Sequence, residues 1–225
     1  MNKQDETLLE AIHDGDVSAV KDCLRRGADP NALQGGDSND PFIFAAFSEF
    51  SHVFPPSYRG DRAESFYGID IDGGVLEVLL AAGANPNVRN GDGDTPLTVA
   101  VDWMNLEAVQ SLLDSGADPN LADGDGRTPL LVAARWTGSD PSSVAEQAAM
   151  IRLLLGRGAC VDAQSHQGET ALISAVANTN GEIVKLLLDF GANRTIADVA
   201  DRTATQYAET IQDPVRRELI LSMLG

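Results

Sequence analysis

Two short strings recur along the chain at matching intervals, and this internal repetition constrains the fold more than any other feature. The string Gly-Ala-Asx begins at residues 27, 83, 116 and 191, with a Gly-Ala-Cys variant at 158, so its intervals are 56, 33, 42 and 33 residues. The string Thr-Pro-Leu begins at 95 and 128, and weaker forms at 170 and 203 keep the intervals 33, 42 and 33. Two markers that stay in step over this length predict an array of similar structural units.

The residues between the markers have the spacing of a pair of helices in each unit. After Thr95, apolar residues follow three and four positions apart: Val99, Ala100, Val101, Leu106, Val109, Leu112 and Leu113. That spacing puts them on one face of a helix pair. Threonine suits the position that caps a helix, and proline suits the first helical position. The glycine of Gly-Ala-Asx falls where the second helix must end, in the left-handed conformation that glycine adopts readily. Asp-Gly stretches then predict the turn into the next unit.

A 33-residue period with Thr-Pro-Leu, followed by Leu-Leu and Gly-Ala-Asp-x-Asn, resembles the ankyrin repeat. The resemblance covers essentially the whole chain and implies an all-α fold, an ankyrin-repeat solenoid of stacked helix-turn-helix units with β-turn fingers. We expect one domain, 1–225, with six repeats near 1–34, 35–89, 90–122, 123–164, 165–197 and 198–225. The histidine that usually follows Thr-Pro-Leu in this family is replaced by Thr98, Leu131 and Ile173, which affects local hydrogen bonding and not the fold.

The chain has two tryptophans, Trp103 and Trp136, and each lies eight residues after the marker threonine of its repeat. In the ankyrin family this place is the end of the inner helix, on the concave face where partners usually dock. Exposed, clustered tryptophans are typical of binding hot spots. The resemblance therefore implies that the pair binds a partner, flanked by Asp102 and Arg135. The alternative is that each ring folds back over its own inter-helix loop.

Repeat 2 contains an insertion that is rich in aromatic residues. From Asp40 to Gly83 there are 43 residues, against 21 from Thr95 to Gly116, and the stretch 42–67 holds eight of the twelve aromatic residues. A solvated loop would not carry so many, so we expect a compact loop that packs on the body of the repeats. The alternative is a direct contact surface, in which Phe47 would bind the partner.

A shorter insertion in repeat 4 adds nine residues around 138–143. Asp140 or Ser139 before Pro141 predicts a new helix start, and the alternative is a longer second helix. The two cysteines, Cys23 and Cys160, are too few for a disulfide framework. Because both occupy repeat positions that are usually small or apolar, we expect buried structural thiols in a reducing compartment.

The charge balance of 16 basic against 34 acidic side chains gives a net charge of −18. Such acidity repels nucleic acid and anionic lipid and steers the chain towards basic partners, although it can also serve only solubility. Asp92, Asp94 and Asp125 concentrate negative charge at the expected fingertips. Because the chain has neither a signal-peptide pattern nor a run of apolar residues long enough to span a membrane, we expect a cytoplasmic protein.

Motifs for catalysis, cofactors or metals are not found in the sequence. The Asp-Gly turns do not complete a calcium loop, and His13, His52 and His166 are neither near a cysteine nor in a paired ligand spacing. We therefore expect a non-enzymatic module, without cofactor or metal, whose concave face holds a basic protein, in the manner of an inhibitor or immunity protein. One alternative is a ligand- or metal-responsive element that uses the aromatic insertion near 48–73. Another is a purely structural spacer.

Overall fold

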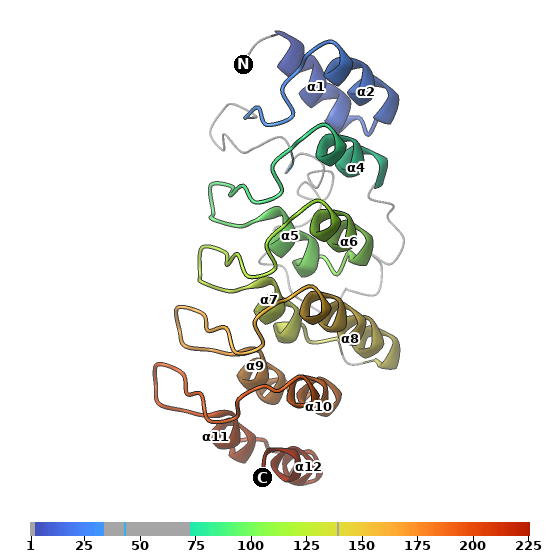
Figure 1. Ribbon diagram of the computed structural model, residues 1–225. Coiled ribbons are helices and arrows are strands. Elements are labelled where there is room, and N and C mark those ends of the chain that lie inside the picture. The colour runs from blue at the N-terminus through green and yellow to red at the C-terminus, as the bar shows by residue number, and fades with distance from the viewer. Residues whose placement is uncertain (1–2, 34–42, 44–72, 139) are drawn as a thin grey trace. The chain divides into compact units, whose positions relative to one another are not determined.

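A computed structural model of the protein describes residues 3–33, 43, 73–138 and 140–225 (Figure 1). Every regular element in these ranges is an α-helix, and an isolated β-bridge joins Ala197 to Thr203. The chain divides into two compact units. Unit 1 comprises 1–96 and 107–117, and unit 2 comprises 97–106 and 118–225. The expected stretch of paired helices is therefore present, in two bodies that we describe separately.

Unit 1 holds α1 (Lys3–His13), α2 (Val17–Arg25), α4 (Gly73–Ala81) and nearly all of α6 (Leu106–Asp114). Helix α2 packs on both α1 and α4. Its core is aliphatic, with Leu8, Val20 and Leu79 fully buried. At the start of α2 the Asp16 carboxylate accepts from the Ala19 amide at 2.9 Å, which satisfies a donor that the helix leaves unpaired.

Unit 2 holds the other helices, which alternate between first and second members of the repeats. The first helices are α5 (Pro96–Asp102), α7 (Pro129–Arg135), α9 (Ala171–Ala177) and α11 (Ala204–Glu209), and the second helices are α8 (Pro141–Gly156), α10 (Gly181–Asp189) and α12 (Pro214–Leu224). Helices α7, α9 and α11 pack in one row, and α8, α10 and α12 pack in another (Figure 1). The core between the rows includes Leu130, Ile151, Leu172 and Leu187, all fully buried.

The markers found in the sequence coincide with helix ends. Thr128, Thr170 and Thr203 are the capping residues of α7, α9 and α11. The three differ in how they cap: Thr170 Oγ1 accepts from the Ile173 amide at 3.2 Å, Thr203 forms a capping box with Gln206, and Thr128 Oγ1 is buried without a partner in the described chain. The glycines that end the second helices all have positive φ: Gly27, Gly83, Gly116, Gly158 and Gly191.

The two Asx residues of Gly-Ala-Asx-x-Asn have separate tasks. In the first position, Asp118 closes its own turn by accepting from the Asn120 amide at 2.8 Å. In the second, Asn120 reaches the next repeat, where its Nδ2 donates to the Gly158 carbonyl at 3.0 Å and its Oδ1 accepts from the Cys160 amide at 2.7 Å. Within unit 1, Asn31 makes the same pair of bonds to the residues around Gly83. The motif therefore joins consecutive repeats through amide side chains.

Among the described residues, four of the turns between repeats are β-turn fingers: 90–94, 123–127, 165–169 and 198–202. In each, one side-chain oxygen at the first position accepts from the amides two and four residues later; these oxygens belong to Asn90, Asp123, Ser165 and Asp198. In unit 2 neighbouring fingers are also linked, because the His166 amide donates to Asp125 O and the Val199 amide to Gln167 O. The expected fingers are confirmed.

The nine-residue insertion of repeat 4 lengthens a helix. Helix α8 has 16 residues, whereas α6 and α10 have nine each. It begins at Pro141, and the Asp140 carboxylate caps it by accepting from the Ser142 and Ser143 amides at 3.0 Å. Both interpretations of the insertion therefore hold: Asp140 marks a helix start, and that helix is an extended second helix of the repeat.

The expectation that both cysteines are buried is wrong for one of them. Cys23 is buried in α2, but Cys160 is exposed. Cys160 stands at the first Asx position of its Gly-Ala-Asx string, and in the other repeats that position holds an aspartate or asparagine in the turn. The turn geometry directs this side chain away from the core, so the thiol contacts solvent.

Candidate functional site

Trp103 is the exposed tryptophan of the predicted pair. It follows the last residue of α5, its amide donates to the Val99 carbonyl at 3.1 Å, and its side chain is 36% exposed. The next residue, Met104, has φ 54° and so adopts the left-handed conformation that few side chains favour. Its counterpart after α9, Thr179, has φ 56°. Helices α5 and α9 therefore end in the same tight turn, and on α5 this turn carries an indole in contact with solvent.

Trp136 has a different environment. It is half-buried and extended, with φ −64° and ψ 137°, because the insertion changes the loop after α7. A Cβ placed on Gly138 would lie 1.9 Å from Cζ3 and 2.0 Å from Cη2 of the indole, so the ring lies directly on this glycine. For Trp136 the geometry matches the alternative in which the ring folds back over its own inter-helix loop.

A buried amide side chain fixes the loop that carries Trp136. Gln147 of α8 is fully buried, and its Nε2 donates to the carbonyls of Ala133 at 2.8 Å and Trp136 at 3.1 Å. Its Oε1 accepts from Asn180 Nδ2 at 2.9 Å, which extends the network to the cap of α10. Every polar atom of the Gln147 side chain is thereby paired, and the Trp136 backbone is held between two repeats.

Arg135, predicted to flank the tryptophans, is bonded within the protein. Its Nη1 donates to Glu169 Oε2 at 2.7 Å, and Glu169 Oε1 accepts from Ser174 Oγ at 2.8 Å. The Arg135 carbonyl accepts from Asn178 Nδ2 at 3.0 Å. Asn178 occupies the place that holds tryptophan in the two preceding repeats, eight residues after the marker threonine. Asp102, the other flanking residue, is half-buried at the end of α5.

The finger acids of unit 2 are used largely to close the fingers. The Asp123 and Asp198 side chains are 2% and 7% exposed, and each also pairs with an arginine of its own finger, Arg127 and Arg202 respectively. Asp125 is 70% exposed and pairs with Arg127 at 2.8 Å. Asp125, one of the three predicted fingertip aspartates, therefore presents an exposed negative charge that Arg127 partly compensates.

A cluster on the last finger lowers the pKa of Asp198 to about 2. The main cause is the Tyr207 hydroxyl, which donates to Asp198 Oδ2 at 2.6 Å and stabilises the ionised carboxylate. The same bond raises the pKa of Tyr207. The Arg202 guanidinium lies over the Tyr207 ring, 4.5 Å from its centroid. These groups satisfy one another, which indicates a structural role in the last repeat.

The remaining predicted residues lie elsewhere or outside the described ranges. Asp92 and Asp94 belong to the finger of unit 1, where their amides donate to Asn90 Oδ1. Phe47 and the aromatic insertion, apart from residue 73, lie outside the described residues, so its packing or partner contact stays a prediction. In the ranges that the structure covers, we find no group of three His, Cys, Asp or Glu residues that could hold a metal ion. No helix in those ranges is long and apolar enough to cross a membrane.

The residues around Trp136 were missed by sequence reasoning. Gln147, Glu169, Asn178 and Asn180 organise the loops after α7 and α9, but none carries a motif. One signal was available, because Asn178 breaks the tryptophan pattern and a polar residue there needs a partner. The contact of Gln147 depends on the register of the nine inserted residues, which the repeat period does not specify.

Comparison with known proteins agrees with the repeat assignment. A family model described as "Ankyrin repeats (3 copies)" matches residues 69–165 and 142–220. A 69-residue stretch, 31% of this chain, is 36% identical to an ankyrin repeat-containing protein of Treponema pallidum (strain Nichols) and covers 23% of it. A 59-residue stretch, 26% of this chain, is 39% identical to an ankyrin repeat protein of Acanthamoeba polyphaga mimivirus and covers 36% of it. The matched stretches thus span less than half of either relative.

Solved structures of similar fold cover nearly the whole chain. The crystal structure of an ankyrin repeat domain from Acinetobacter baumannii AYE aligns with a TM-score of 0.74 and 23% identity, over 96% of this chain and 95% of that one. A crystal structure of another ankyrin repeat protein aligns with a TM-score of 0.71 and 26% identity, over 98% and 96%. Ankyrin repeats are in general protein-protein interaction modules and not enzymes. The family match and the helix pairs together confirm the expected all-α ankyrin-repeat fold, and the chain belongs to the ankyrin-repeat family.

Proposed function

We propose that this protein binds a basic protein through the face formed by the ends of its first helices, with Trp103 at the centre of the contact. The observation that supports this proposal most strongly is the exposure of Trp103. This residue lies at the end of α5 and is 36% exposed. Tryptophan is a large apolar side chain that gains most from being covered, and it is over-represented among residues that dominate binding energy. Trp136, which is half-buried, would form a smaller part of the same contact.

The charge of the chain supports a basic partner. The net charge is −18, and the acidic Asp102 directly precedes Trp103 in the sequence. Opposite charge accelerates association and selects against acidic competitors. Within this class we favour an inhibitor, in the manner of an immunity protein that neutralises a basic enzyme, acting in the cytoplasm. No described feature favours the ligand- or metal-responsive alternative.

Affinity capture from the native cell, followed by titration of the purified partner, tests the proposal. Wild type should recover a basic protein, and Trp103→Ala should weaken its affinity by about 30-fold or more, as expected for a hot-spot tryptophan worth about 2 kcal/mol. Raising the salt concentration should weaken binding of wild type. If the partner is an enzyme, adding this protein should abolish its activity.

Phe190→Ala is the matched control. Phe190 caps the end of α10 and is 43% exposed, so the variant removes an exposed aromatic side chain that lies neither at the end of a first helix nor in the first turns of α10. Its affinity should equal that of wild type. Equal binding by wild type and Trp103→Ala would refute the contact at α5, and recovery of acidic partners without salt dependence would refute the electrostatic part.

A further inference from the structure

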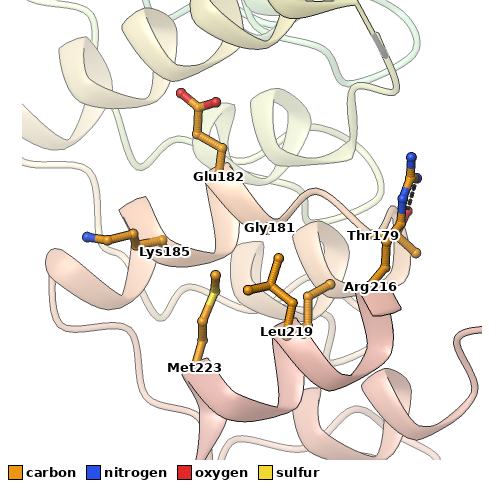
Figure 2. A pocket seen from close by; sticks show the side chains of 8 residues that line it. Thr179, Gly181, Glu182, Lys185, Arg216, Leu219 and Met223 are labelled. Atoms are coloured by element: carbon orange, nitrogen blue, oxygen red, sulfur yellow. Dashed lines mark hydrogen bonds between the residues drawn. The ribbon is translucent and has the colours of Figure 1, made fainter. Parts of the chain in front are cut away.

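A cleft of about 350 Å³ opens between the second helices of the last two repeats (Figure 2). Its lining comes from the loop before α10, the first turns of α10 and one face of α12, and includes Gly181, Glu182, Lys185, Arg216, Leu219 and Met223. Both helices belong to unit 2, and they pack against each other beside the cleft. Neither Trp103 nor Trp136 lines it, so it is separate from the face of the proposed function.

The cleft is open because its wall lacks a side chain at one point. Gly181 begins α10, and a Cβ placed there would lie 3.7 Å from Leu219 Cδ2 and 4.0 Å from Met223 Cε, which is ordinary contact distance. In Figure 2 the Leu219 and Met223 side chains extend from α12 towards this bare backbone. The glycine therefore leaves room for roughly one aliphatic group that the two side chains would contact.

The apolar surface continues beyond the cleft along α12. Leu219 is 51% exposed, and Val215, one turn earlier on the same helix, is 75% exposed. Residues four apart lie on the same side of a helix, so these two form an apolar stripe next to the opening. Ile220, by contrast, is buried and belongs to the core. An apolar stripe beside an open cleft suits a partner segment that presents aliphatic side chains.

The charges around the cleft favour a cationic segment. Lys185 Nζ is already paired with Asp189 at 2.7 Å. Arg216 lies 3.7 Å from Asp213, and its Nη1 is 3.5 Å from Thr179 Oγ1. The Glu182 carboxylate has neither a hydrogen bond nor an ion pair within the described part of the chain. The two cations are thus compensated internally, and the available charge is negative.

We propose that the α10–α12 cleft is a second contact site for the basic partner, and that it takes one aliphatic side chain of a segment whose lysine or arginine pairs with Glu182. This inference rests on the proposed function in one respect, namely that the partner is a basic protein. The stripe of Val215 and Leu219 covers the rest of that segment. The partner then contacts the chain on both its first and its second helices.

Gly181→Ala separates binding from folding. The added methyl group narrows the cleft, while alanine in place of glycine favours the helix. Thermal stability should therefore rise slightly, whereas affinity for the captured partner should fall by about tenfold, an effect of the size expected when one apolar contact is lost. An unchanged affinity with raised stability would overturn the proposal.

The role of the Glu182 carboxylate is tested by comparing the affinity of Glu182→Lys with that of Glu146→Lys. Glu146 is an exposed glutamate of α8, so the second variant makes the same change in charge elsewhere. Both variants alter long-range attraction equally, so an affinity loss at least several-fold larger for Glu182→Lys supports a local pair. Equal losses would overturn it. If Glu182→Lys binds normally while Trp103→Ala does not, the cleft inference fails and the proposed function stands.

A peptide probe makes the test independent of the captured protein. We would titrate the full ¹⁵N-labelled chain with a blocked 12-residue peptide of lysine and leucine, arranged on opposite faces of a helix, and with the same peptide carrying glutamate in place of lysine. Chemical-shift changes centred on Gly181, Glu182 and Leu219 with the lysine peptide only would support the site. Shifts elsewhere would overturn it, as would sedimentation showing that the cleft instead holds a second copy of this chain.

Discussion

On the finger side of unit 2 the same hydrogen bonds recur from repeat to repeat, whereas the loops that end the first helices differ at nearly every position. Each finger is closed by one side-chain oxygen, provided by Asp123, Ser165 or Asp198. The position eight residues after the marker threonine, by contrast, holds tryptophan twice, then Asn178 and Ile211. The fingers (the recurring side) therefore repeat one hydrogen-bond pattern, whereas the loops that end the first helices (the variable side) carry different residues and, after α7, a different conformation from the tight turn after α5 and α9.

The difference teaches where stability and specificity lie. A recurring hydrogen bond contributes a similar free energy of stabilisation at every junction between repeats. This is expected for a repeat protein that is stabilised by nearest-neighbour contacts. The loop after α7 is stabilised by a partner that the other described loops lack, because Gln147 Nε2 donates to the Trp136 carbonyl. Residues released from the common pattern can be exposed, as Trp103 is, without weakening the rest of the array.

The largest expected effect lies on the variable side. Gln147→Leu would leave the Trp136 carbonyl and the Asn180 amide unpaired in partly buried places, and the Ala133 carbonyl would keep only its longer bond from the Trp136 amide, so we expect the free energy of unfolding to fall by about 3 kcal/mol. Urea denaturation would measure it. Gln212→Leu, at an exposed position after α11, is the control and should change stability by less than about 0.5 kcal/mol. Equal values for the two variants would show that the loop is not held by Gln147.

The next effect tests the recurring side. Asn120→Ala removes two bonds to the following repeat, at Gly158 and Cys160, and because both are exposed we expect a loss of about 1–2 kcal/mol. In the following repeat the same place holds Asp162, which accepts from the Asn193 amide but has no proton to donate. Asp162→Asn should therefore raise stability by about 0.5 kcal/mol, since it restores the donor. A loss for Asp162→Asn would mean that the junctions are not equivalent.

Much of the recurring side could be predicted from the sequence because its constraints are local. A glycine with positive φ after each second helix follows from the Gly-Ala-Asx string alone, and the φ of 90° at Gly158 is an example. The environment of Trp136 could not be predicted in the same way. Its contact with Gly138 and its bond to Gln147 depend on how nine inserted residues fold, and no second copy of that segment exists for comparison.

One misjudged position shows that the repeat itself could have corrected the prediction. The prediction that Cys160 is buried assumes that its repeat position is usually small or apolar. That position of Gly-Ala-Asx is polar in the other repeats, for example Asp118 and Asn193, and Cys160 is exposed there. The binding role proposed for Trp103 differs in kind, because the exposure of Trp103 follows from the structure whereas the identity of a partner does not.

A smaller effect compares two equivalent threonines. Thr170→Val removes a hydroxyl that caps α9, so we expect a loss of about 1 kcal/mol. Thr128→Val removes a buried hydroxyl that has no hydrogen-bond partner among the described residues, so stability should be unchanged or rise slightly. Calorimetry on both variants checks the pair. If Thr128→Val proves as costly as Thr170→Val, the Thr128 hydroxyl has a partner in solution and the two caps are alike.

The smallest expected effect concerns the one finger of unit 2 that has a residue other than glycine at the left-handed position. Asp201 has φ 60° where the other fingers have glycine, Gly126 at 77° and Gly168 at 73°. Aspartate tolerates this conformation better than most residues, yet glycine adopts it without steric cost. Asp201→Gly should therefore raise the free energy of unfolding by about 0.5 kcal/mol, whereas Asp201→Ala should lower it by a similar amount. Thermal unfolding of the three proteins measures both signs. A stability loss in Asp201→Gly would mean that the carboxylate itself stabilises the last finger, and this finger would then belong with the variable loops.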